Sequence, residues 1–147
     1  MIQLVTSNNI IQATAVYWES WMDSHKSFCS EDFLKIHTLE YQKEYLEEKI
    51  KRGISVYISI KEKPVGIVSV NGNTIEDLYV LPQEQNKGYG TELLLFAIRQ
   101  CPSQPVLWIL ENNRDAQRLY ERHGFYLTGK SHQLSDTLSE LELILKP

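Results

Sequence analysis

Short apolar segments recur along the chain, and their length, β-branched content and alternation with polar residues predict β-strands. Residues 54–60 follow the alternating pattern of apolar and polar positions, whereas residues 106–110 are apolar throughout. The pattern predicts a sheet of about six to seven strands. The expected strands are residues 2–6, 54–60, 65–70, 74–80, 106–110, 125–128 and 138–145.

Helical spacing of apolar residues predicts about four helices around this sheet. The first follows residues 7–9, which are all of capping type. Its predicted apolar face comprises Ile11, Ala15, Trp18 and Met22. The second, residues 31–52, is highly charged and should end at Gly53. Its apolar stripe comprises Phe33, Ile36, Leu39, Leu46 and Ile50. The remaining helices are residues 91–100, which Pro102 stops, and residues 114–123, which Gly124 caps.

Tight turns set the order of the strands. The turns at residues 61–64 and 71–73 join three successive strands, which must form an antiparallel meander. The helix at 91–100 is a crossover, and it should place residues 106–110 parallel to residues 74–80. We therefore expect a single domain, residues 1–147, of mixed α/β (α+β) class with a mostly antiparallel sheet.

Composition and charge narrow the kinds of partner. The net charge is −4 at pH 7, and there is no basic stripe of the kind that nucleic-acid binding requires. No apolar run approaches the ~20 residues of a membrane span, and the N-terminus lacks the features of a signal peptide. We expect a cytoplasmic protein without nucleic-acid or membrane partners. Cys29 and Cys101 form no C-x-x-C pair, and His25 and His37 have no partner at ligand spacing, so no metal site is expected.

Residues 85–91 contain Gly88 and Gly90 and lie between an expected strand and an expected helix. The first turn of a helix offers unpaired N–H groups at the positive end of its dipole. Glycine has no Cβ, so a bulky phosphate can come close to these groups. The segment therefore predicts a site for a diphosphate-bearing ligand.

Two other glycine-rich loops fit this segment less well. A P-loop would need lysine followed by Ser or Thr after the last glycine, where this chain has Thr91-Glu92. The dinucleotide-binding fingerprint would need a small residue at Leu93, and only the place of Glu111 supports it. It remains the weaker alternative.

Two motifs follow each other in the second half of the chain. The first is Gln85-x-x-Gly88-x-Gly90, after a strand that ends Leu78-Tyr79-Val80-x-Pro82. The second is Asn113-x-x-Ala116-x-x-Leu119-Tyr120-x-x-x-Gly124-Phe125. In sequence, order and separation they resemble the motifs of the GNAT superfamily of N-acetyltransferases. The resemblance implies acetyl-CoA as co-substrate. It also implies a mixed, mostly antiparallel central sheet flanked by about four helices, with a splayed parallel strand pair at the CoA site.

The resemblance also implies how the cofactor is held. The loop N–H groups would bind the phosphates, and the strand end would pair with the pantetheine arm, with the Val80 N–H toward the thioester oxygen. The arm needs room, so residues 74–80 and 106–110 should part, aided by a bulge near Leu78. Asn113 would contact the arm and is also a candidate N-cap. The implied cofactor-binding residues are Leu78, Tyr79, Val80, Gln85, Asn86, Lys87, Gly88, Tyr89, Gly90, Thr91, Asn113 and Tyr120.

Three residues are candidates for catalysis. Tyr120 stands where the family has its general acid, and a phenol of pKa near ~10 is protonated at neutral pH; a plain core tyrosine is the alternative. Glu76 and Asp77 are consecutive on a strand, so their carboxylates point to opposite faces unless a bulge intervenes. Several family members carry a glutamate where this chain has Trp108, which speaks against a base on residues 106–110. The expected order of candidate bases is Glu76, then Asp77, then water alone.

The resulting hypothesis is an N-acetyltransferase that moves an acetyl group from acetyl-CoA to a primary amine by direct attack in a ternary complex. The alternative is a non-catalytic CoA-binding or regulatory domain. The acceptor, a small-molecule or peptide amine, stays open, although the acidic balance favours a cationic or neutral one. Aromatic residues of the first third are candidates for its pocket: Trp18, Trp21, Phe28, Tyr41 and Tyr45. The closing strands expose an edge that a partner could cover, which allows a homodimer.

Overall fold

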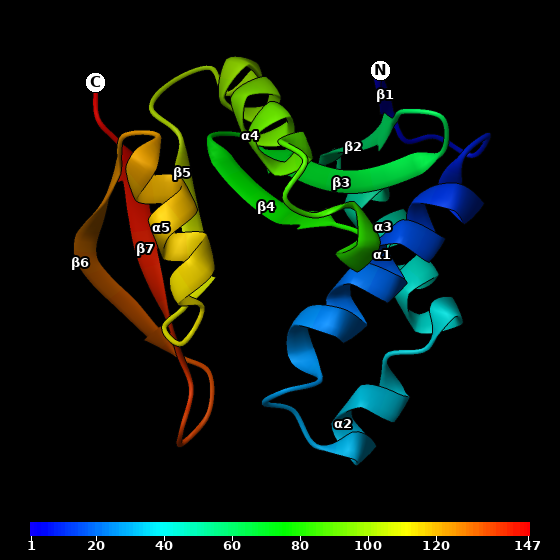
Figure 1. Ribbon diagram of the computed structural model, residues 1–147, viewed down its shortest axis with the longest axis horizontal. Coiled ribbons are helices and arrows are strands. Elements are labelled where there is room, and N and C mark those ends of the chain that lie inside the picture. Colours follow the sequence, from blue (N-terminus) through cyan, green and yellow to red (C-terminus); the bar gives the residue numbers. More distant parts are fainter.

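The computed structural model describes every residue from Met1 to Pro147, with strands and helices interleaved along the chain (Figure 1). The strands are β1 (Ile2–Leu4), β2 (Ser55–Ile60), β3 (Pro64–Asn71), β4 (Thr74–Val80), β5 (Val106–Leu110), β6 (Phe125–Gln133) and β7 (Ser139–Leu145). The helices are α1 (Ile10–His25), α2 (Glu31–Ile36), α3 (Leu39–Lys51), α4 (Tyr89–Gln100) and α5 (Arg114–Arg122), with a 3-10 turn at Pro82–Glu84.

All seven strands form one sheet in the order β1-β2-β3-β4-β5-β7-β6. Every neighbouring pair is antiparallel except β4 and β5, which are parallel. The predicted meander, the parallel crossover and the fold class are therefore confirmed. The hairpin between β3 and β4 closes with Asn71 opposite Thr74, and Gly72 supplies the positive φ of +63° that so tight a turn needs.

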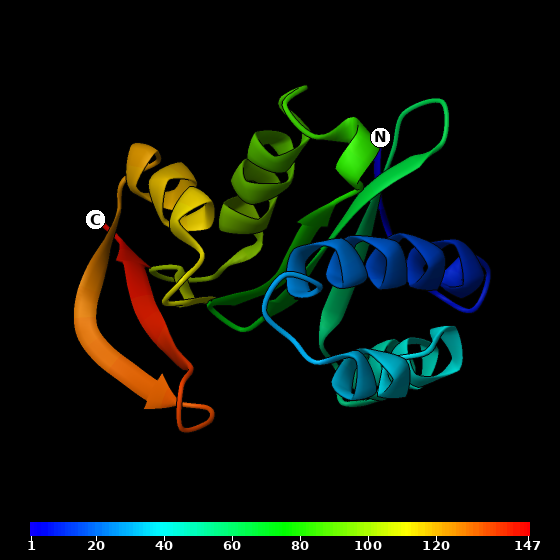
Figure 2. The ribbon, with the colours of Figure 1, turned by 60° about the horizontal axis from the view of Figure 1, so that its bottom comes forward.

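Helices cover both faces of the sheet. The first three helices lie on one face, and α4 and α5 lie on the other (Figure 2). Strand β3 serves both sides, because Ile67 packs with α1 and α3 while Val68 and Val70 pack with α4. Leu46 of α3 and Leu93 of α4 are fully buried at the centres of the two clusters. None of the helices combines the length and the apolar character that crossing a bilayer demands.

The prediction of one helix over residues 31–52 is wrong. α2 ends at Ile36 and α3 begins at Leu39, so the sheet is flanked by five α-helices rather than about four. Thr38 between them has extended backbone angles, and its hydroxyl accepts a hydrogen bond from the N–H of Tyr41 at 3.1 Å. This side-chain cap offers the chain a fresh helix start in place of continuation.

The buried face of α1 also differs from the predicted one. Ile11 is 67% exposed and Ala15 is exposed as well, so the predicted stripe faces solvent for much of its length. The face that enters the core comprises Ile10, Ala13, Val16, Tyr17 and Trp21. Apolar residues occur on both sides of this helix. Their spacing was therefore compatible with either of two apolar faces and did not show which one is buried.

The closing hairpin is longer than predicted, because β6 runs on to Gln133. Its pairing with β7 shifts register between Leu127 and Ser131, where Gly129 has a φ of +93°. β6 is an edge strand, and irregularities of this kind hinder edge-to-edge pairing. A homodimer through this edge stays a prediction.

Candidate active site

A cavity of about 910 Å³ opens where β4 and β5 part. The two strands pair only at Thr74–Val106 and Ile75–Leu107, and beyond these residues they diverge (Figure 1). The predicted gap is thus confirmed. Both strands line the cavity, together with the end of α1 and the loop after it, the start of α5, and Glu140 of β7.

A bulge turns β4 away from β5. Asp77 and Leu78 together oppose one residue of β3, Val68, and Asp77 has a positive φ of +53°. The bulge predicted near Leu78 is therefore confirmed. Beyond it, Leu81 donates its N–H to a carbonyl of β3 at 2.9 Å. Because an antiparallel ladder alternates, the N–H of Val80 points to the opposite edge, into the gap.

The glycine-rich loop between β4 and α4 carries a row of free N–H groups. Gly88 is the N-cap of α4 with a φ of +87°, and Asn86 has a φ of +64°. The cap makes no side-chain hydrogen bond, and no hydrogen bond within the protein uses the N–H groups of Tyr89, Gly90 or Thr91. This geometry suits an anion such as a phosphate.

Two side chains fix this loop to its surroundings. Gln85 donates its amide to the carbonyl of Val80 at 3.2 Å, which ties the loop to the end of β4. Lys87, which directly precedes the N-cap Gly88, pairs with Glu84 at 3.0 Å and stays half exposed. Together, the loop and the gap fit a ligand with a diphosphate and an extended arm.

α5 brings Asn113 and Tyr120 to the same cavity. The side chain of Asn113 caps α5, because its Oδ1 accepts a hydrogen bond from the N–H of Ala116 at 3.1 Å. Tyr120 is only 8% exposed and packs edge-on against Phe125. No protein group hydrogen-bonds to its hydroxyl, and burial raises its pKa, so the phenol keeps its proton.

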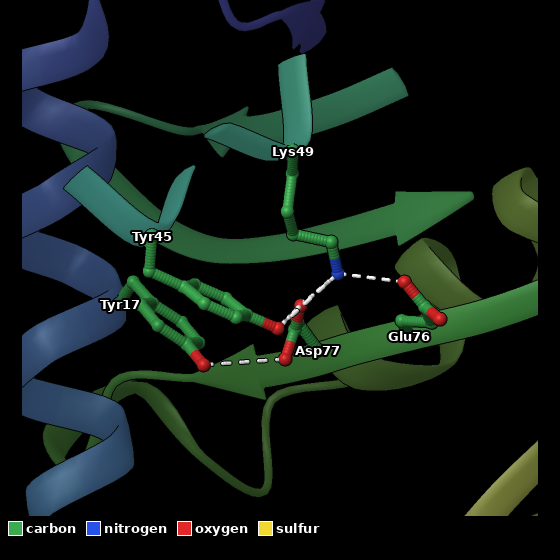
Figure 3. A network of polar contacts seen from close by, with 5 residues as sticks. All are labelled: Tyr17, Tyr45, Lys49, Glu76 and Asp77. Atoms are coloured by element: carbon green, nitrogen blue, oxygen red, sulfur yellow. Dashed lines mark hydrogen bonds and ion pairs between the residues drawn. The ribbon is translucent and has the colours of Figure 1, made fainter. Parts of the chain in front are cut away.

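Glu76 and Asp77 both contact a buried lysine (Figure 3). Lys49 of α3, whose side chain is 3% exposed, places Nζ 2.7 Å from Oε1 of Glu76 and 2.5 Å from Oδ2 of Asp77. Without the bulge, consecutive strand residues would point to opposite faces. The bulge thus turns both carboxylates toward α3.

The two carboxylates differ in how fully they are engaged. Tyr17 donates its hydroxyl to Oδ1 of Asp77 at 3.2 Å, and Tyr45 donates to Oδ2 at 2.9 Å, so both oxygens of Asp77 have partners (Figure 3). Glu76 is half-buried, lines the cavity and has one oxygen, Oε2, without a protein partner. Of the pair, Glu76 is the carboxylate available to a ligand.

Burial sets the protonation of this network. Burial, reinforced by the Asp77 carboxylate, raises the pKa of Tyr45 to about 12 and also raises the pKa of Tyr17. Burial is the largest single influence on Lys49 and would lower its pKa, but Asp77, Tyr45 and the hydrogen bonds to Asp77 and Glu76 together outweigh it, and the pKa ends above its ordinary value. At neutral pH the lysine is therefore charged and both phenols are neutral.

Comparison with known proteins decides the family. The model of the acetyltransferase (GNAT) family matches residues 15–125. The chain belongs to the GNAT family. The peptidyl-lysine N-acetyltransferase YjaB of Salmonella typhimurium is 25% identical over 114 residues, which are 78% of this chain and 75% of that protein.

Solved GNAT structures share the fold. PaiA N-acetyltransferase from Thermoplasma acidophilum, in complex with coenzyme A, matches with a TM-score of 0.79 at 21% identity, over 100% of this chain and 98% of that one. YncA of Salmonella typhimurium, solved with its cofactor acetyl-CoA, matches with a TM-score of 0.71 at 20% identity. The match covers 99% of this chain and 92% of that one. As a GNAT protein the chain is an acetyl-CoA-dependent N-acetyltransferase, which confirms the predicted family and cofactor.

Lys49 and Tyr17 are residues of this GNAT site that the sequence analysis missed. Gln42, Leu46 and Lys49 follow each other at helical spacing on α3, and all three are buried. A lysine on a core-facing stripe needs an acidic partner. The two consecutive acids of β4 were the sequence signal that could have identified this partner.

Two of the five aromatic candidates line the cavity of this GNAT protein, namely Phe28 and Tyr45. Trp21 instead stacks between His25 and His37, with ring centroids 4.0 Å and 4.3 Å away. Those histidines thus have a packing role. Trp108 lines the cavity from β5 and stacks on His132.

Replacing the buried ammonium tests this network. Lys49→Met should lower the free energy of unfolding by about 3 kcal/mol, because Asp77 is left buried without its cation. In the double variant Lys49→Met/Asp77→Asn, the loss in free energy of unfolding should be about 2 kcal/mol smaller than the sum of the losses in the two single variants. Urea unfolding followed by circular dichroism measures both quantities.

Lys51→Met is the matched control, since Lys51 is exposed on the same helix. It should stay within about 0.5 kcal/mol of the parent protein. Additive effects in the double variant would show that Lys49 and Asp77 are not energetically coupled.

Proposed function

We propose that this GNAT enzyme transfers the acetyl group directly from acetyl-CoA to a primary amine bound in the same cavity. The observation that supports the proposal is that Glu76, Val80 and Tyr120 all line that cavity, where Glu76 has an oxygen, Val80 an N–H and Tyr120 a hydroxyl without a protein partner. An N–H donor, a proton source and a base are what aminolysis of a thioester requires.

An acetyl-cysteine intermediate has no support. Neither cysteine is among the residues that line the cavity. Burial raises the pKa of both Cys29 and Cys101, which disfavours the thiolate that would have to attack. Direct attack by the amine is therefore the simpler route.

The cofactor roles follow the geometry of the loop and the strand. The free N–H groups of Tyr89, Gly90 and Thr91 would hold the phosphates, with Lys87 adding positive charge. The freed edge of β4, from Leu78 through Tyr79 to Val80, would pair with the pantetheine arm, and Asn113 would contact the arm from α5.

The chain's own groups then divide the chemistry. Acetyl-CoA supplies the activated acetyl thioester. Glu76 accepts the proton of the incoming ammonium, and the Val80 N–H stabilises the charge that develops on the carbonyl oxygen. Tyr120 would donate its proton to the sulfur as the carbon–sulfur bond breaks. It would regain a proton from the attacking nitrogen, which must lose a second one to become the amide. Asp77, with both oxygens engaged, acts as the anchor of Glu76 and Lys49 rather than as a second base.

Two assays test the overall proposal. Isothermal calorimetry should show CoA binding, and a thiol reagent should report CoA release only when an amine is present. The panel should include small amines and a lysine-containing peptide, because the relative YjaB is named a peptidyl-lysine acetyltransferase. Binding of CoA with no thiol release for any amine would instead mark a non-catalytic CoA-binding domain.

Tyr120→Phe isolates the proposed acid. It removes only the hydroxyl from a buried ring, so folding and CoA affinity should persist while kcat falls about 100-fold. Tyr126→Phe, at an exposed position on β6, should leave kcat unchanged. A full rate in Tyr120→Phe would assign this tyrosine to the core alone.

Glu76→Gln isolates the proposed base. The amide keeps the size and can still accept from Lys49, but it cannot take a proton, so kcat/KM should fall about 100-fold near neutral pH. The rise of kcat/KM with increasing pH should also be altered in Glu76→Gln, because that rise reports the deprotonation of the base. Asp77→Asn should instead act mainly on the free energy of unfolding. The opposite pattern, with rate lost in Asp77→Asn and kept in Glu76→Gln, would exchange the two roles.

A further inference from the structure

The cavity is lined by five carboxylates and by no lysine or arginine. Asp115 at the start of α5 is exposed and pairs with Arg118. The other four acids are Asp23 at the end of α1, Glu76 and Asp77 on β4, and Glu140 on β7. All four are partly buried, and they approach the cavity from three different elements. A cation in this space would meet negative charge on more than one wall.

Nearby cations do not cancel this charge. Lys49 is buried behind β4 and can offset only one of the two carboxylates that it contacts. Lys26 pairs with Asp23 at 3.0 Å, but it is 68% exposed and is not part of the lining. Glu140 has only His132 beside it, at 3.5 Å on an exposed part of β6.

Two further observations mark the cavity as a ligand site for such a molecule. Tyr120 is more than nine-tenths buried, lines the cavity and has an unpartnered hydroxyl. Phe28, Tyr45 and Trp108 add aromatic rings to the lining. Aromatic faces attract ammonium groups, so they complement the carboxylates.

We propose that the acceptor is an amine that carries a second positive charge. Asp23 and Glu140 bind the distal charge, while Glu76 faces the nitrogen that is acetylated. The inference rests on the proposed acetyltransferase function and names the substrate class of the same site. The same carboxylates would repel an acceptor that carries a distal carboxylate.

A matched series of amines tests the charge alone. 1,4-Diaminobutane, butylamine and 4-aminobutyrate share a four-carbon chain and differ in the distal group, and 1,8-diaminooctane, octylamine and 8-aminooctanoate repeat the series at a longer reach. In at least one of the two series, kcat/KM should be about 10-fold higher for the diamine than for the monoamine, and lowest for the amino acid. Raising the salt concentration to about 0.2 M should narrow the ratio.

Variants then locate the charge. Glu140→Gln, Asp23→Asn and their combination should reduce the diamine-to-monoamine ratio, and the double variant should reduce it most. Glu47→Gln removes one carboxylate from an exposed site on α3 and should leave the ratio unchanged. Circular dichroism confirms that each variant is folded.

The outcomes separate the two proposals. An enzyme that acetylates the monoamines as well as the diamines, or whose ratio survives in the double variant, overturns the dicationic acceptor and leaves the acetyltransferase function intact. An enzyme that binds CoA but acetylates no amine overturns both.

Discussion

The interruption of hydrogen bonding between β4 and β5 is the constraint on which the site depends. Only two residue pairs join these strands, because the bulge at Asp77 and Leu78 bends β4 away. Backbone N–H and C=O groups beyond the last pair need other partners, since an unpaired buried group is costly. An extended ligand with amide groups can take the place of the missing strand edge. The defect in the sheet and the capacity for a cofactor are thus the same feature.

The buried ammonium of Lys49 makes this bulge tenable. Turning two consecutive carboxylates to one side of a strand brings like charges together, which a nearby cation offsets. Lys49 supplies that cation from α3, and Tyr17 and Tyr45 complete the hydrogen bonding of Asp77. The helices of the first third therefore do more than cover the sheet. Their packing fixes where the free oxygen of Glu76 lies, so the stability of this region and the position of the proposed base are linked.

The fold was largely predictable because its signals are local. Residues 74–80 and 106–110 coincide with β4 and β5, and the turns and the crossover helix dictate their directions. The glycine-rich loop was predictable for the same reason, since Gly88 and Gly90 are separated by a single residue and lie directly at the start of α4. The Lys49 network was not, because it joins residues that lie 28 and 32 positions apart. Local spacing also misled at Thr38, where a single side-chain cap divides a continuous helical pattern.

The distribution of charge suggests how two unlike substrates share one cavity. The loop that follows β4 lies outside the lining apart from Gln85, and the start of α4 offers free N–H groups and the positive end of a helix dipole, which favour the anionic phosphates of a cofactor. The end between α1 and β7 offers carboxylates and aromatic rings, which favour an ammonium. Like charges repel, so under the proposed function each substrate would favour its own region. Glu76, which Lys49 holds in place at 2.7 Å, would then take the proton that the amine must give up before it can attack.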